Sequence, residues 1–168
     1  MFAELIFKTI GAFRRVYLWS LNKYYKKRLN IESSVRLGFV KMDKKNITIA
    51  KGTYIQSGEI FSGDALVTIG KYCAIGKNVS IKARTHDLTQ PTPDEINLVN
   101  KQKFANISIG DRVWIGDNVF IKEGINIGND AVIAANSVVT KDVPAKMIAG
   151  GVPAKILREN TSLIRVNA

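Results

Sequence analysis

Residues 109–144 read IGDRVW IGDNVF IKEGIN IGNDAV IAANSV VTKDVP when they are divided into sixes. Every hexad begins with isoleucine or valine, and the earlier stretch 69–86 keeps the same frame as IGKYCA IGKNVS IKARTH. The fifth positions of the later hexads hold residues of small or moderate volume: Val113, Val119, Ile125, Ala131, Ser137 and Val143. A weaker start of the pattern falls at Ile49, Ile55 and Phe61. A period of six fits neither an α-helix nor a simple alternating strand, and it predicts the hexapeptide repeats of a parallel β-helix.

Each hexad is expected to form a short strand and a turn. The aliphatic first residue points inward, the small fifth residue fits a tight corner, and Gly or Asn relaxes the backbone at the turns. Three hexads make one coil of a triangular prism, and a coil buries its inner face only by stacking on its neighbours. Cys73 occupies a fifth position, so we interpret it as an interior filler rather than a nucleophile.

We divide the 168 residues into three parts. Residues 1–45 form a basic, helical N-terminal segment, residues 46–157 form the β-helix domain, and residues 158–168 form a C-terminal tail. Within the domain, residues 84–106 break the hexad frame and contain two prolines and many polar residues. Such an insertion in a solenoid is usually a binding feature, so we expect an active-site loop here.

The N-terminal segment carries eleven Lys or Arg residues against three acidic ones, which accounts for most of the formal net charge of +11. Apolar residues recur there in steps of three and four, which predicts an amphipathic α-helix. They are Phe2, Leu5, Ile6, Ile10, Phe13, Tyr17, Leu21 and Tyr24. No charge-free run approaches the roughly 20 residues of a membrane-spanning helix. Two roles stay open for this helix: peripheral contact with an anionic membrane surface, or packing within the protein's own assembly.

Other partners and compartments are constrained by simple counts. One cysteine and one histidine allow no internal disulfide and too few ligands for zinc, so we expect no metal. No groove-reading motif accompanies the basic residues, and we expect no nucleic-acid partner. With no cleavable signal pattern evident, a reducing cytoplasm is the expected compartment.

Three short motifs, VWIG (113–116), SVVTKDVP (137–144) and GVPAK (151–155), accompany a histidine that heads a long insertion. Together, over roughly residues 47–158, they resemble the hexapeptide-repeat, acetyl-CoA-dependent sugar and polysaccharide O-acetyltransferases. The resemblance implies an all-β fold, a left-handed parallel β-helix with an N-terminal amphipathic α-helix and a protruding loop. It also implies a homotrimer with active sites between subunits.

His86 is the only histidine in the chain, and it occupies the last position before the hexad frame breaks. The resemblance implies that a general base stands at such a loop. A sugar hydroxyl is a poor nucleophile at neutral pH, and imidazole can take its proton as the oxygen attacks a thioester carbonyl. Asp87 is a second catalytic candidate, as a carboxylate that orients the ring, although neighbours in sequence seldom face each other. Otherwise Asp87 is a solvated loop residue.

The resemblance further implies how acetyl-CoA binds. The residues expected to contact it are Trp114 at the acetyl end, Asp117 mainly through its backbone, Ala135, Thr140 and Lys141 along the pantetheine arm, and Lys155 and Arg158 near the adenine and phosphates. The basic side chains would attract phosphate by charge. Each of them is otherwise an ordinary surface charge, and Trp114 is otherwise an outer-face residue covering the loop.

We therefore predict transfer of an acetyl group to a hydroxyl of a saccharide, such as a polysaccharide, capsule or lipopolysaccharide precursor. Galactoside-type enzymes carry a substrate-binding Asn one coil earlier, where this chain has Gly58, which argues against simple galactosides or maltose as acceptors. Two alternatives remain: N-acetylation of a nucleotide-linked amino sugar, and a non-enzymatic β-helix that serves as a structural or binding module.

Overall fold

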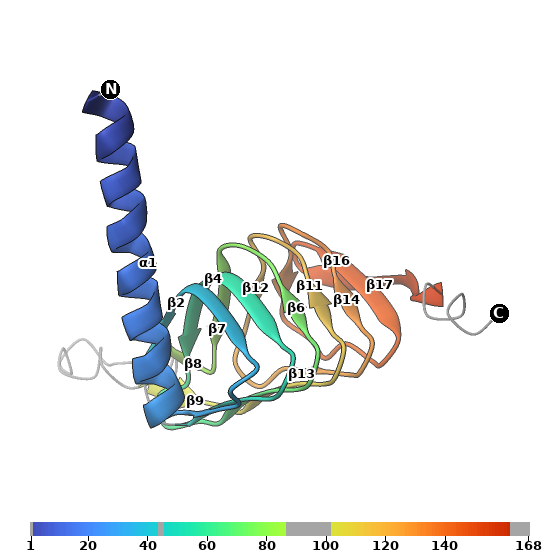
Figure 1. The fold of residues 1–168 in the computed structure, drawn as a ribbon. Coiled ribbons are helices and arrows are strands. Elements are labelled where there is room, and N and C mark those ends of the chain that lie inside the picture. Colours follow the sequence, from blue (N-terminus) through green and yellow to red (C-terminus); the bar gives the residue numbers. More distant parts are fainter. Residues whose placement is uncertain (1, 44–45, 87–101, 162–168) are drawn as a thin grey trace, which may run out of the picture.

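A computed structural model describes residues 2–43, 46–86 and 102–161, with the backbone alone for residues 2–10. Helix α1 (Phe2–Arg28) is followed by short strands that wind into a solenoid (Figure 1). The solenoid has three faces, and each is a stack of parallel strands one coil apart. This is the architecture that the hexad period predicts.

Most of the strands can be assigned to one of the three faces. The first face consists of β1 (Asn30–Ile31), β3 (Ile47–Ile49), β5 (Val67–Ile69), β10 (Ile107–Ile109) and β13 (Asn126–Ile127). The second contains β6 (Ala74–Ile75), β11 (Trp114–Ile115), β14 (Val132–Ile133) and β16 (Met147–Gly151). The third contains β7 (Val79–Lys82), β12 (Phe120–Ile121) and β15 (Val138–Val139).

The remaining strands join or extend these faces. β2 (Arg36–Met42) pairs with β4 (Tyr54–Phe61), and β4 pairs with both β6 and β7, so it runs across the corner between the second and third faces. β17 (Ala154–Glu159) returns antiparallel beside β16. β8 (Arg84–His86) and β9 (Gln102–Phe104) form a separate antiparallel hairpin.

The strand register confirms that three hexads make one coil. Ile109 lies beside Ile69 in the preceding coil and Ile127 in the next. First-position residues are buried, and so are the fifth-position residues that the repeat predicts as corner fillers: Cys73, Val79, Val113, Val119, Ile125, Ala131, Ser137 and Val143. Most fourth positions adopt positive φ, a left-handed conformation that Asn and Asp tolerate better than most residues. Examples are Asn78, Asn118, Asp130 and Asn136.

The β-helix begins earlier than residue 46, our predicted boundary. α1 ends at Arg28, and β1 and β2 already form the first coil. The frame also slips in β4, where Ile60 is buried and Phe61 is only half-buried. Because β4 continues through a corner without a hexad turn, its inward positions shift by one residue. At the other end, Arg158 belongs to β17 and not to a separate tail.

α1 contacts the β-helix through its C-terminal part (Figure 1). Tyr25 and Leu29 are buried, and the Tyr25 hydroxyl accepts a hydrogen bond from the Met42 backbone N–H at 3.0 Å. In the described part of the predicted apolar stripe, Leu21 packs against the core, whereas Phe13 is 76% exposed and Tyr17 is 53% exposed. Among the described residues, no helix is both long and apolar enough for a bilayer crossing.

Candidate functional site

His86 stands at the end of β8, in the hairpin that leaves the β-helix where the hexad frame breaks. The hairpin departs from the corner after β7 and returns to the first face at β10. His86 pairs with Gln102 across the hairpin, and its side chain is exposed. The break in the repeat therefore does place the histidine on a projecting element.

The base of the hairpin rests on a tight turn of the preceding coil. Gly63 has φ of +56°, and a Cβ added there would lie 2.3 Å from the ring of Phe104 on β9. The Asp43 carboxylate holds this turn, accepting hydrogen bonds from the backbone N–H groups of Ser62 at 2.9 Å and Gly63 at 3.1 Å. Only glycine leaves room for the aromatic ring that seats the hairpin.

A surface hollow of about 460 Å³ lies in front of the hairpin. Its lining combines the histidine with aromatic, basic and polar groups: Phe61, Lys82, Arg84, Thr85, His86, Gln102, Phe120, Lys122 and Glu123. These residues come from β4, β7, the hairpin and β12, and hence from three successive coils. A cavity of this size that contains a titratable base has the properties of a small-molecule site.

Two lysine side chains that line the hollow form ion pairs with glutamates. Lys82 Nζ lies 2.9 Å from Glu59 Oε1, and Lys122 Nζ lies 3.0 Å from Glu123 Oε1. Partial burial alone would raise the pKa of Glu59, but hydrogen bonds from Lys82 and Ser80 outweigh it and leave this pKa lowered. Glu59 is therefore a stable anion that fixes Lys82, and it is not placed to act as an acid near neutral pH.

Four of the seven expected acetyl-CoA residues lie on two different edges of the prism. Thr140 and Lys141 follow β15 at the corner where the hairpin also leaves, one coil beyond Lys122. Asp117 and Ala135 stack at the opposite corner of the third face, where the Asn136 N–H donates to the Asp117 carbonyl at 2.9 Å.

The other three expected contacts belong to the second face. Trp114 points outward from it and is 59% exposed. Lys155 and Arg158 are exposed on β17, which is paired with β16 of the same face. In one chain, Thr140 and Lys141 thus share an edge of the prism with the hairpin that carries His86, whereas the other five expected residues lie on the second face or at its corner with the third face. Asp87, the predicted orienting carboxylate, lies outside the described residues.

Several lining residues were missed by the sequence analysis, although the repeat holds a signal for two of them. Lys82 and Lys122 are both second residues of hexads that begin IK, and one coil of stacking puts these hexads side by side. Phe61 and Arg84 have no comparable signal, because β4 leaves the hexad frame and the hairpin is not part of it.

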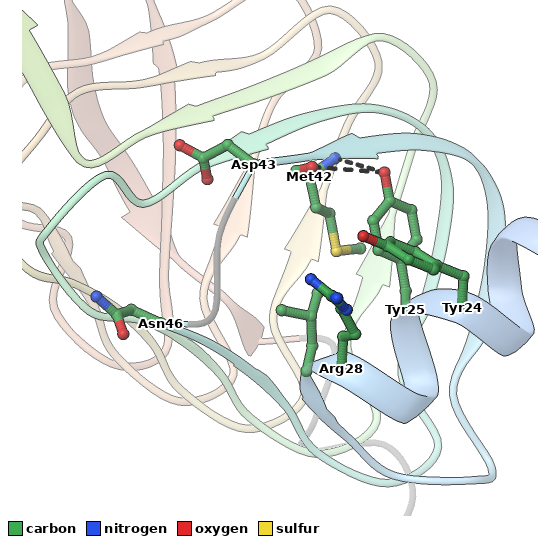
Figure 2. A pocket seen from close by; sticks show the side chains of 7 residues that line it. Tyr24, Tyr25, Arg28, Met42, Asp43 and Asn46 are labelled. Atoms are coloured by element: carbon green, nitrogen blue, oxygen red, sulfur yellow. Dashed lines mark hydrogen bonds between the residues drawn. The ribbon is translucent and has the colours of Figure 1, made fainter.

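A second hollow, of about 400 Å³, lies between the end of α1 and the first coil (Figure 2). Tyr24, Arg28, Met42 and Asp43 line it, and the Arg28 guanidinium carbon is 5.5 Å from the Tyr24 ring centroid. Its one carboxylate, Asp43, accepts hydrogen bonds from Ser62 and Gly63. No group in this lining is placed as a free general base, so His86 marks the better candidate site.

The remaining reactive group is buried. The Cys73 thiol lies 3.1 Å from the Gly110 carbonyl oxygen, and burial raises its pKa. A thiol held protonated in the core is a poor nucleophile, as expected for an interior filler. Among the described residues, no cluster of three or more His, Cys, Asp or Glu side chains could hold a metal ion.

Comparisons with known proteins support the class that fold and site define, a β-helical acyltransferase. Residues 106–141 match the family described as "Hexapeptide repeat of succinyl-transferase". Galactoside O-acetyltransferase of Escherichia coli K12 is 37% identical over 114 residues, which is 68% of this chain and 54% of that protein. The matched part of the chain thus spans about half the length of this curated relative.

Two solved structures match this chain over a larger share of their own length than the curated relative does. A hexapeptide-repeat acetyltransferase of Vibrio cholerae, crystallised with acetyl-CoA, superposes with a TM-score of 0.69 at 32% identity and covers 83% of this chain and 77% of that one. A galactoside acetyltransferase in complex with coenzyme A gives a TM-score of 0.68 at 30% identity, covering 83% of this chain and 69% of that one. The chain belongs to the hexapeptide-repeat acetyltransferase family, and its solenoid is the left-handed parallel β-helix of that family.

Proposed function

We propose that this protein transfers an acetyl group from acetyl-CoA to a hydroxyl of a saccharide, with His86 as the general base. The carrying observation is the exposed position of His86 in a hollow at an edge of the β-helix. Relatives named as galactoside acetyltransferases, one of them holding coenzyme A, support the reaction class. Saccharides of polysaccharide, capsule or lipopolysaccharide precursors are the proposed acceptors.

The proposed step is a direct transfer. His86 accepts the hydroxyl proton as the acceptor oxygen bonds to the thioester carbonyl carbon. The tetrahedral intermediate collapses with cleavage of the C–S bond, and the coenzyme A sulfur leaves with a proton from the imidazolium or solvent. Backbone N–H groups at a coil turn would stabilise the oxyanion. Because the thioester is already activated, no acyl-enzyme is required.

We propose that the active site forms between subunits of a homotrimer. The reason is geometric: the hairpin edge with Thr140 and Lys141 and the residues of the second face lie apart on one chain. A neighbouring copy that presents its second face to the hairpin edge would unite Trp114 with His86. Closed rotational assemblies of identical chains are the usual solution for such complementary surfaces.

Gly58 bears on the choice of acceptor. Its φ is +141°, and a Cβ added there would lie 2.0 Å from the Val79 carbonyl oxygen. No side chain fits at this position, so the Asn contact of galactoside-type enzymes has no counterpart there. This supports an acceptor other than a simple galactoside.

The function is tested by following free thiol with purified protein, acetyl-CoA, and a panel of sugars, glycan intermediates and nucleotide-linked amino sugars. His86→Ala should lower acceptor-dependent thiol release by about 100-fold or more. Calorimetry should show that this variant still binds acetyl-CoA. Exclusive use of amino sugars would favour N-acetylation. Thiol release that is unchanged in His86→Ala would refute the base assignment, and an absence of turnover with every acceptor would favour a binding module.

We also propose that the projecting half of α1 contacts an anionic membrane surface, on the cytoplasmic side. Phe13, Val16, Tyr17 and Trp19 are between 53% and 76% exposed, and Arg14 and Arg15 lie among them. Exposed aromatic residues beside basic ones are the composition of helices that lie in the interface.

Liposome sedimentation tests this contact. The full chain should sediment with vesicles containing anionic lipid at low salt, and deletion of residues 1–28 or high salt should abolish sedimentation. A full chain that never sediments would show that the helix packs within the assembly instead.

A further inference from the structure

Basic side chains outnumber carboxylates around the hollow beside His86. Lys82, Arg84 and Lys122 line it, and Glu123 is the one carboxylate in its described lining. Lys41 belongs to β2 in the first coil, and its Nζ lies 5.6 Å from the Phe61 ring centroid. Glu59 and Glu123 pair with Lys82 and Lys122, so the charge of Arg84 is the one in this lining without a described carboxylate beside it, and it favours an anion in the hollow.

Phe61 is the centre of this arrangement. Three cationic groups lie near the centroid of its ring: Lys41 Nζ at 5.6 Å, Lys82 Nζ at 5.7 Å and the Arg84 guanidinium carbon at 5.1 Å. A cation over an aromatic face is attracted by the ring, and the contact orients the side chain. Cations from three strands, β2, β7 and β8, therefore surround this ring, which lines the hollow.

Arg84 differs from its lysine neighbours. Lys82 is paired with Glu59 and Lys122 with Glu123, whereas within the described part of the chain Arg84 has no carboxylate partner within ion-pair distance. Arg84 is half-buried and lies two residues before His86 on the same short strand. A guanidinium offers paired N–H donors that match a carboxylate or phosphate.

We infer that the acetyl acceptor is an anionic saccharide, whose carboxylate or phosphate is bound by Arg84 while a nearby hydroxyl faces His86. This inference rests on the proposed function. The phosphates of acetyl-CoA are a poor alternative for this charge, because the thioester must face His86 and the phosphates are at the far end of the pantetheine arm. Lys155 and Arg158, on β17 at the opposite end of the solenoid, are the groups proposed for those phosphates (Figure 1).

The test compares a neutral acceptor with two acidic derivatives of it, using the unmodified chain and acetyl-CoA. The neutral saccharide that is used best in the acceptor panel above, its uronic acid and its phosphate monoester supply a neutral, a carboxylate and a phosphate member. The kcat/KM for at least one anionic member should exceed that for the neutral member by about tenfold or more, as a charge-assisted hydrogen bond predicts. The better of the two anions identifies the group that the site prefers, and high salt should reduce the preference.

Arg84→Gln should remove this preference by raising KM for the anion about tenfold or more, with the KM for acetyl-CoA unchanged. Lys103→Gln is the matched control, because it removes one positive charge from the same hairpin at an exposed position outside the described lining. It should leave the preference intact. Thermal melting of both variants checks that they fold.

Three results would overturn the inference. Equal or better use of the neutral sugar contradicts it while leaving the proposed function standing, and this measurement needs no variant. A raised KM for acetyl-CoA in Arg84→Gln, with acceptor preference unchanged, would show that the cation serves the cofactor. Thiol release that responds to no acceptor and does not depend on His86 would remove both the inference and the proposed function.

Discussion

Asp130 shows how a single residue holds two neighbouring coils together. Its carboxylate is 6% exposed and accepts two hydrogen bonds from Arg112 of the preceding coil, from Nε at 2.6 Å and from Nη2 at 2.8 Å. The hydrogen bonds and charge of Arg112 lower the pKa of Asp130 despite its burial. A bidentate pair of this kind fixes the geometry of the corner between the first and second faces.

This pairing predicts a pH-dependent stability. Because the folded pKa of Asp130 is lower than the unfolded value near 3.9, the stabilisation is complete above pH 4 to 5 and is lost as pH falls through the folded pKa. Asp130→Asn should cost about 1–3 kcal/mol at pH 7, measured by chemical denaturation. The difference between the two proteins should shrink below pH 4.

Arg112→Gln provides the control. If the two side chains act as a pair, the double variant should be little less stable than either single one. Additive losses in the double variant, or a pH profile unchanged by Asp130→Asn, would contradict the pairing.

Among single residues, burial is predicted best where the repeat dictates it. The hexad frame identified the inward and corner positions from Ile69 onward, because every side chain there meets the same neighbours in each coil. Arg84 could not be identified, since its importance comes from Phe61 of another coil. Asp130 could not be identified either, because its partner Arg112 lies one coil away.

At the scale of elements, the β8–β9 hairpin is the decisive departure from regular repeats. The sequence indicates where the hairpin begins, because the insertion predicted at 84–106 starts at Arg84, the first residue of β8. It does not indicate how the hairpin is seated, since the contact of Phe104 with Gly63 joins elements from different coils. α1 was predicted as a helix, but its buried side was not, because the stripe of Phe13 and Tyr17 continues past the end of the β-helix surface.

Gly63→Ala should therefore damage catalysis through the hairpin. The added methyl group meets the Phe104 ring, so the hairpin must shift and carry His86 with it. Misplacement of a catalytic group by about an ångström costs up to about 100-fold in rate, so we expect kcat to fall by about 10- to 100-fold. Steady-state thiol release measures this, and acetyl-CoA affinity should change little.

Gly124→Ala is the matched control for backbone strain. Gly124 also has positive φ, at +81°, but its added Cβ would meet only the Ala105 methyl at 3.4 Å. Gly124→Ala should lose about 1 kcal/mol of stability and Gly63→Ala at least as much, while only Gly63→Ala should lose most of its activity. Equal activity in the two variants would show that the seating of the hairpin is unimportant.

At the scale of the whole molecule, the solenoid separates groups that the proposed reaction needs together. Stacked coils place the hairpin on one edge, and Trp114 and β17 on another face, and no bend of a stiff prism can join them. A sequence analysed as one chain predicts the correct coils but not this separation, because strand register becomes visible only in the fold. The separation is the physical argument for a site completed by a neighbouring copy.

The most direct test of this account is a crystal structure of the full chain grown with coenzyme A. We predict a homotrimer in which the coenzyme A sulfur lies close enough to His86 of one subunit for a single acceptor hydroxyl to bridge them. Trp114 and Ala135 against the same coenzyme A would come from the neighbouring subunit. A coenzyme A molecule bound along one chain, with its sulfur remote from every His86, would contradict the proposed mechanism and the assembly together.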